Sequence, residues 1–244
     1  MRWVLSLLAF AGSIFGQSFE VASVKLNTMD TRGFIGPIPG GKGFRGFKAT
    51  SARLKVLVMM AYGVSDRQVS GGPKWVESDG FDIDARAEKP TSDAQVRLML
   101  QSLLADRFQL KVRRETKEEP VYALLVEKDS PNLIAHADDG APPEIKIGAK
   151  PTERVFTNLP ISRLVLLLEG ETGRTVLDKT SLEGNYDFKL DYLSTLSKGP
   201  REDPEAIGQS IFKALRDQLG LKLESQKGPS EHVTIEHAER PSGN

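Results

Sequence analysis

The sequence predicts an α+β protein built as two tandem β-α-β-β-α-β-β units that arose by internal duplication. The second half of the 244-residue chain repeats the pattern of the first at fixed offsets. Residues 67–69 recur as residues 174–176, and residues 106–112 recur as residues 217–223. We expect each unit to place two helices on one small sheet.

The first residues are typical of a signal peptide. Arg2 precedes an apolar run at residues 3–15, so we predict that residues 1–17 are cleaved on export. The run is too short to cross a bilayer, which takes about 20 apolar residues. We therefore expect an exported protein, periplasmic or extracellular, with no stable membrane span after cleavage.

The first unit is predicted over residues 18–128. Alternating residues from Ser18 onward predict an opening strand, and apolar residues at helical spacing over 54–62 predict a helix that ends at Gly63. Residues 81–85 alternate cleanly, which predicts a strand with Phe81, Ile83 and Ala85 inward.

The rest of this unit is predicted as one helix and two strands. Ser92 or Asp93 caps a helix with an apolar stripe over residues 96–104. Residues 109–115 and 121–127 then form two strands around a charged turn at residues 116–119.

The second unit is predicted over residues 151–240. The preceding residues 129–150 lack a sustained period and are predicted to be a linker. Pro160 starts the first helix of the second unit. The remaining elements match the first unit. Tyr186, Phe188 and Leu190 form a strand, and residues 233–235 form the closing strand. A helix carries the apolar residues Ile207, Ile211, Phe212 and Leu215.

Composition excludes several classes of function. The chain has no cysteine, which excludes thiol catalysis, zinc–thiolate sites and iron–sulfur ligation. Lys+Arg and Asp+Glu are both 33, so no overall field attracts nucleic acid, and no nucleic-acid partner is expected.

One turn offers a candidate binding surface, formed by Gly71, Gly72, Pro73 and Trp75. An exposed tryptophan beside a glycine turn can act as a platform for a ligand. The alternative is a buried plug, which is favoured because the counterpart of Trp75 in the second unit is Leu182.

Carboxylates offer a candidate catalytic site. Asp82 and Asp84 lie on one face of a predicted strand, where they could bind a cation or act as a general acid–base pair. Their counterparts are Asp187 and Lys189, so the pair is not duplicated and a solvated face is favoured. His232 and His237 fall on opposite faces of a strand. We assign no catalytic residue, metal or cofactor.

Several motifs resemble a family of soil-associated bacterial proteins of unknown function. In the first half they are residues 19–25, 71–75, 81–85, 103–108 and 120–124, and in the second half residues 178–180, 184–188 and 219–224. The resemblance implies a domain that is exported alone or fused behind membrane metallopeptidases of the BlaR type. This chain lacks the HExxH motif of those peptidases, so the resemblance does not imply peptidase activity.

Together, these observations predict a non-enzymatic binding or interaction module in the cell envelope. Its expected partner is an envelope protein or a cell-wall fragment. Two alternatives remain open. One is a hydrolase that uses Asp82, Asp84 or Asp187, and the other is a regulatory ectodomain that acts with a BlaR-like sensor.

Overall fold

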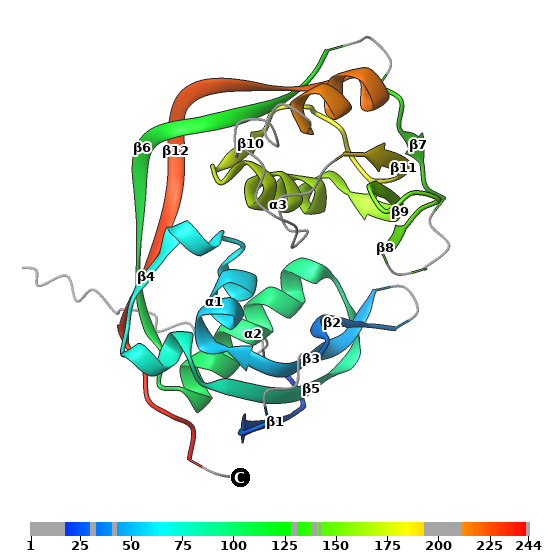
Figure 1. Ribbon diagram of the computed structural model, residues 1–244. Helices are drawn as coiled ribbons and strands as arrows, with labels where there is room; N and C mark the ends of the chain where they lie inside the picture. Colours follow the sequence, from blue (N-terminus) through cyan, green and yellow to red (C-terminus); the bar gives the residue numbers. More distant parts are fainter. Residues whose placement is uncertain are drawn as a thin grey trace, which may run out of the picture.

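The computed structural model describes residues 18–29, 33–40, 43–127, 131–137, 141, 143–192 and 211–242 (Figure 1). This part of the chain is a mixed helix and strand fold with three four-stranded sheets. The predicted signal peptide, residues 1–17, lies outside the described residues. Within them, no helix is both long and apolar enough to cross a membrane.

The first sheet carries two helices that bury its core face. Its strands, in spatial order, are β1 (Val21–Asn27), β5 (Gly80–Thr91), β3 (Phe44–Arg53) and β2 (Ile35–Pro39). Helices α1 (Leu54–Tyr62) and α2 (Asp93–Arg107) pack on it. The predicted apolar stripes of both helices are buried, as are Phe81, Ile83 and Ala85 of β5. Gly63 ends α1 in the left-handed conformation, as predicted.

The second sheet has a matching strand arrangement. Its strands, in spatial order, are β7 (Ile134–Ala135), β11 (Asn185–Asp191), β9 (Glu153–Pro160) and β8 (Glu144–Ile147). It packs with α3 (Ile161–Thr172) and with a helical segment described from Ile211, which ends in the π-helical η3 (Leu215–Leu219). Residues 129–150, predicted as a linker, thus supply both edge strands, because β7 and β8 pair with β11 and β9.

The third sheet joins the two halves of the chain. Its order is β10 (Val176–Asp178), β6 (Lys111–Val126), β12 (Leu221–His237) and β4 (Val69–Gly71). The long strands β6 and β12 pair antiparallel from Leu221 opposite Val126 to His237 opposite Lys111. Figure 1 shows this pair running along one side of the molecule, from the first sheet to the second.

The predicted turn at residues 116–119 is wrong, because β6 continues through it without a break. The charged residues there form ion pairs along and across the two strands. Arg114 pairs with Glu231, and Glu115 pairs with Lys117 at 2.6 Å. Opposite charges on neighbouring strands stabilise a sheet. The charged residues therefore form an exposed face of the paired strands and do not form a turn.

Each half of the chain completes the core of the other half. Val233 and Ile235 of β12 belong to the first core, with α1 and α2, whereas Leu124 of β6 belongs to the second core, with α3. The short strands follow the same rule. Val69 of β4 lies opposite Val233, and Val176 of β10 lies opposite Tyr122 of β6. The two halves are therefore interleaved.

A buried polar cluster lies where β4 and β10 approach the long strands. Ser230 is fully buried and its hydroxyl lies 2.6 Å from the hydroxyl of Thr175. Gln68 donates to the Glu231 carbonyl at 2.8 Å and to Ser230 at 3.3 Å. These bonds satisfy polar groups that would otherwise destabilise the centre of the fold.

Candidate functional site

Trp75, the predicted ligand platform, packs against the first core. It lies in the short 3-10 helix η2 (Lys74–Glu77). Its ring stacks on Phe108 at 6.4 Å and meets Phe81 edge-on at 5.9 Å, and the Arg240 guanidinium lies 5.3 Å from its centroid. These contacts favour the interpretation of Trp75 as a plug of the core.

The glycines next to Trp75 allow strand β4 to lie close to strand β12. Gly71 and Gly72 have φ angles of 80° and 79°. A Cβ on Gly71 would lie 2.6 Å from the carbonyl oxygen of Ile235. Pro73 precedes η2 and its carbonyl accepts from Val76. The turn at Gly71, Gly72 and Pro73 thus has a structural reason that requires no ligand.

Two of the candidate catalytic carboxylates, Asp82 and Asp187, lie in different sheets. Asp82 of β5 accepts from the Ser51 backbone N–H at 2.8 Å, and Asp187 of β11 accepts from the Asn158 N–H at 2.8 Å. Both N–H groups belong to residues in the left-handed conformation, with φ near 52° and 54°. Each aspartate therefore stabilises an irregular backbone just before a helix.

Asp84, the third of these carboxylates, pairs with Arg86 at 2.8 Å on the exposed face of β5. It is thus engaged away from Asp187, which lies in a different sheet. Within the described part of the chain, no cluster of three or more His, Cys, Asp or Glu residues could bind a metal ion. His232 instead pairs with Glu119 at 3.3 Å and His237 with Glu239 at 3.0 Å.

A large hollow of the described surface lies between the two halves of the chain. This inter-half groove has a volume of about 970 Å³ and is lined by both halves, including Ser92, Asp93 and Arg97 from one and His136, Asn158 and Arg163 from the other. Helices α2 and α3 both begin at it. The groove is therefore a product of how the halves pack and belongs to neither alone.

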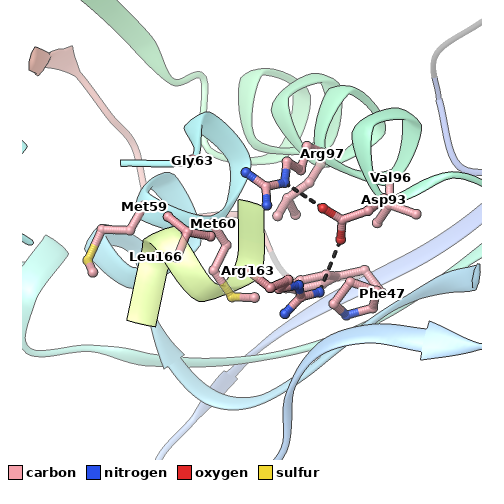
Figure 2. Close-up of a pocket in the computed structure, with 11 residues that line it drawn as sticks. Phe47, Met59, Met60, Gly63, Asp93, Val96, Arg97, Arg163 and Leu166 are labelled. Atoms are coloured by element: carbon pink, nitrogen blue, oxygen red, sulfur yellow. Dashed lines mark hydrogen bonds and ion pairs between the residues drawn. The ribbon is translucent and has the colours of Figure 1, made fainter. Parts of the chain in front are cut away.

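Three charged side chains lie at the floor of the inter-half groove. Asp93 accepts from Arg97 at 2.9 Å within α2 and from Arg163 of α3 at 3.1 Å (Figure 2). About a third of each side chain is exposed. Two guanidinium groups share one carboxylate, so this trio carries a formal charge of +1 at neutral pH.

Beneath the charged trio lies a smaller, mostly apolar cavity. It has a volume of about 60 Å³, and the same three charged residues line it on one side. Its other walls include Met59 and Met60 of α1, Leu100 of α2 and Leu166 of α3 (Figure 2). The trio thus lines both the groove and the apolar cavity, an arrangement typical of sites for ligands with one charged group and one apolar group.

The opposite wall of the groove is a network of polar side chains. His136 Nδ1 lies 2.8 Å from the Asp187 carboxylate. Asn185 donates to the Asn158 side-chain carbonyl at 2.6 Å. Asn158 in turn donates to the Ala141 carbonyl. These contacts fix the orientation of the amide and imidazole groups, so the groove wall is preorganised.

Residues on both sides of the groove also hold α3 in place. At its first turn Arg163 binds Asp93, and at its end the Gly173 carbonyl accepts from Arg67 at 2.9 Å. Both partners belong to the first half of the chain. The inner face of α3 also carries Glu169, whose buried carboxylate accepts from the Val176 N–H at 2.9 Å, and burial raises the pKa of this group.

Sequence reasoning missed every residue of this charged trio. One signal was present, because Arg163 lies in the first turn of a predicted helix, where the helix dipole disfavours a cation. A nearby carboxylate would offset this unfavourable interaction, but the sequence does not identify Asp93 as the partner of Arg163. The sequence favoured His136 as a solvated loop residue, because it lies in the predicted linker, whereas it contacts Asp187 and lines the groove.

The comparisons with known proteins give one match. No curated protein and no solved structure matches the chain. The sequence model of a family described as "Protein of unknown function (DUF3738)" matches residues 55–238, which is most of the 244-residue chain and includes most residues that line the groove. The chain therefore belongs to the DUF3738 family.

Proposed function

We propose that the protein is an exported, non-enzymatic binding module that holds its ligand in the inter-half groove. The observation that carries this proposal is the groove itself, a hollow of about 970 Å³ with two arginines on its floor and fixed amides on its wall. Ligand sites in proteins are commonly concave, with a few fixed polar groups. A cell-wall fragment or a segment of an envelope protein would suit the cell envelope, the location that the predicted signal peptide favours.

We also propose that the two halves arose by duplication of one unit, and three correspondences support this. The strand order β1-β5-β3-β2 matches β7-β11-β9-β8. The pairing of Val69 with Val233 matches that of Val176 with Tyr122 at the offsets of the sequence repeat. Ser51 and Asn158, two further counterparts, share a left-handed backbone held by an aspartate. In this proposal, the groove formed when one unit became two.

The hydrolase alternative has less support. Asp82 and Asp187 accept backbone N–H groups in different sheets, and Asp84 is paired with Arg86. A general acid–base pair needs two groups that can reach one substrate bond. Nothing in the geometry favours the regulatory ectodomain over a simple binding module.

A bulky side chain in the groove tests the proposal. Ser162 is exposed in the first turn of α3 and lines the groove. We expect Ser162→Trp to remove most of what the protein, residues 18–244, captures from an envelope extract of its host, read by mass spectrometry. The indole obstructs the groove beside Arg163, whereas it should not disturb the fold because the site is exposed.

The matched control places the same side chain at the other end of α3. Gly170 is exposed, and a Cβ there has no neighbour within 4 Å. Gly170→Trp should therefore capture the same material as the wild type. If Ser162→Trp is folded by circular dichroism and still captures all of this material, the ligand does not bind in the groove.

A further inference from the structure

We propose that the inter-half groove recognises a peptide-like chain that ends in a free carboxylate next to a small apolar side chain. The carboxylate binds Arg97 and Arg163, and the side chain enters the cavity lined by Met59, Met60 and Leu166. This inference rests on the proposed function, because it names the ligand class of the same groove.

The charge of the site selects an anion. Asp93 is the acidic residue among the described residues that line the groove and the cavity, and it faces two guanidinium groups. Its bonds use Arg97 Nε and Arg163 Nη2. Each guanidinium has five N–H donors in a planar fork that matches a carboxylate, so donors remain for a second carboxylate.

The starts of two helices reinforce this preference. Ser92 caps α2, whereas the residue before α3 is Pro160, which makes no side-chain bond to the first N–H groups of α3. Ser92, Asp93, Pro160 and Ser162 all line the groove. The partial positive charge of both helix ends therefore adds to that of the arginines.

The adjoining cavity sets the size of the neighbouring group. Its volume of about 60 Å³ leaves room for only a few heavy atoms. Its apolar walls hold water poorly, so a methyl or isopropyl group gains by filling it. Two methionines in the wall adapt to small differences in shape. A large aromatic side chain does not fit without displacing α3.

The polar wall accommodates the rest of the chain. The groove is far larger than one carboxylate, and Asn158 and Asn185 line it as fixed amides. Asn158 is 8% exposed and accepts from Asn185, so it holds in place the Asn185 amide, a side chain of the kind that bonds to peptide groups. A chain that starts at the arginines can thus extend along the groove past these residues, as a terminal peptide segment does.

The test is calorimetric titration of the protein, residues 18–244, with N-acetylated dipeptides. We expect acetyl-Ala-Ala acid to bind at least tenfold more tightly than its C-terminal amide, because the amide lacks the charge. Acetyl-Ala-Gly acid, which lacks only the methyl group next to the carboxylate, should bind about fourfold more weakly, the value of one methyl group at about 0.8 kcal/mol. Acetyl-Phe-Phe acid should not bind. Equal affinity for acid and amide would overturn the inference.

Three variants locate the carboxylate. Arg163→Gln should weaken acetyl-Ala-Ala binding at least tenfold. Asp93→Asn should strengthen it, because the Asp93 carboxylate offsets part of the positive charge of the two arginines. Arg216→Gln, which removes a charge paired with Glu127 on a distant helix, should leave it unchanged. A folded Arg163→Gln variant with wild-type affinity, or weaker binding by Asp93→Asn, would contradict the assignment.

Titration with acetyl-Ala-Ala acid of the L,L and of the D,D configuration distinguishes two possible sources of the ligand. The L,L form stands for a protein terminus and the D,D form for a wall-derived peptide, and preference for either is consistent with the site. If neither binds, the inference fails. In that case, loss of capture from the envelope extract by Ser162→Trp would still support the groove as the ligand site. Wild-type capture by Ser162→Trp would contradict the proposed function as well.

Discussion

Neither half of the chain is expected to fold stably without the other. We predict that residues 18–127 and residues 131–242, prepared as separate fragments, each lack a cooperative urea transition. The first fragment loses Val233 and Ile235 from its core together with the partner strand of β6. Each aliphatic side chain contributes roughly 1.5–3 kcal/mol when buried. The loss is then comparable with the total stability of many domains, about 5–15 kcal/mol.

Mixing the two fragments provides the control for this prediction. Equimolar mixing should restore the far-ultraviolet circular dichroism of the intact chain and the fluorescence of Trp75. Trp75 is the single tryptophan of residues 18–244 and stacks on Phe108 in the first core, so it reports that core directly. A cooperative transition for residues 18–127 alone, with native Trp75 fluorescence, would mean that the halves are independent domains.

The second large effect is expected at Leu124. This residue belongs to the first half by sequence but is fully buried in the second core, against the elements around α3. We predict that Leu124→Ala lowers the free energy of unfolding by about 2–5 kcal/mol, the usual cost of truncating a buried leucine. Urea unfolding followed by circular dichroism measures this change.

Whether Leu124→Ala also destabilises the first core distinguishes an interleaved fold from two independent domains. Because the halves share β6 and β12, Trp75 fluorescence should report the same lowered midpoint, although Trp75 lies in the other core. Leu125→Ala, at a half-buried neighbouring position, is the matched control and should cost clearly less. An unchanged midpoint by Trp75 fluorescence in Leu124→Ala would show that the two cores unfold separately.

Local pattern was sufficient to predict helices α1 and α2 and the inner strand β5. The apolar stripes of residues 54–62 and 96–104 became the buried faces of α1 and α2, and Gly63 ends α1 as expected. The alternation at residues 81–85 identified the buried face of β5. In these segments, side-chain periodicity within one element determines which residues are buried.

Long-range pairing was not predictable from local pattern. The charged residues 116–119 read as a turn because the partner strand, about a hundred residues away in the sequence, is not visible in the local pattern. Residues 129–150 showed no period because β7 and β8 are short edge strands with exposed side chains. Edge strands take their structure from the sheet that they join.

The candidate site was unpredictable for the same reason. Asp93 and Arg163 are separated by 70 positions and meet only because α2 and α3 begin at one groove. By contrast, Trp75 and its glycine turn were conspicuous in sequence, and their contacts are explained by packing against the first core. The residues that stand out in the sequence, Trp75 and its glycine turn, therefore belong to the surroundings of the first core. The groove forms only when both halves of the chain pack together.

Hydrogen–deuterium exchange with and without the captured envelope material tests the central claim most directly. If the ligand lies in the inter-half groove, amides at residues 92–97 and at residues 161–164 should both become protected, because both helix starts line it. Protection confined to residues 71–75, with no change at α2 and α3, would place the ligand on the tryptophan turn and contradict the account.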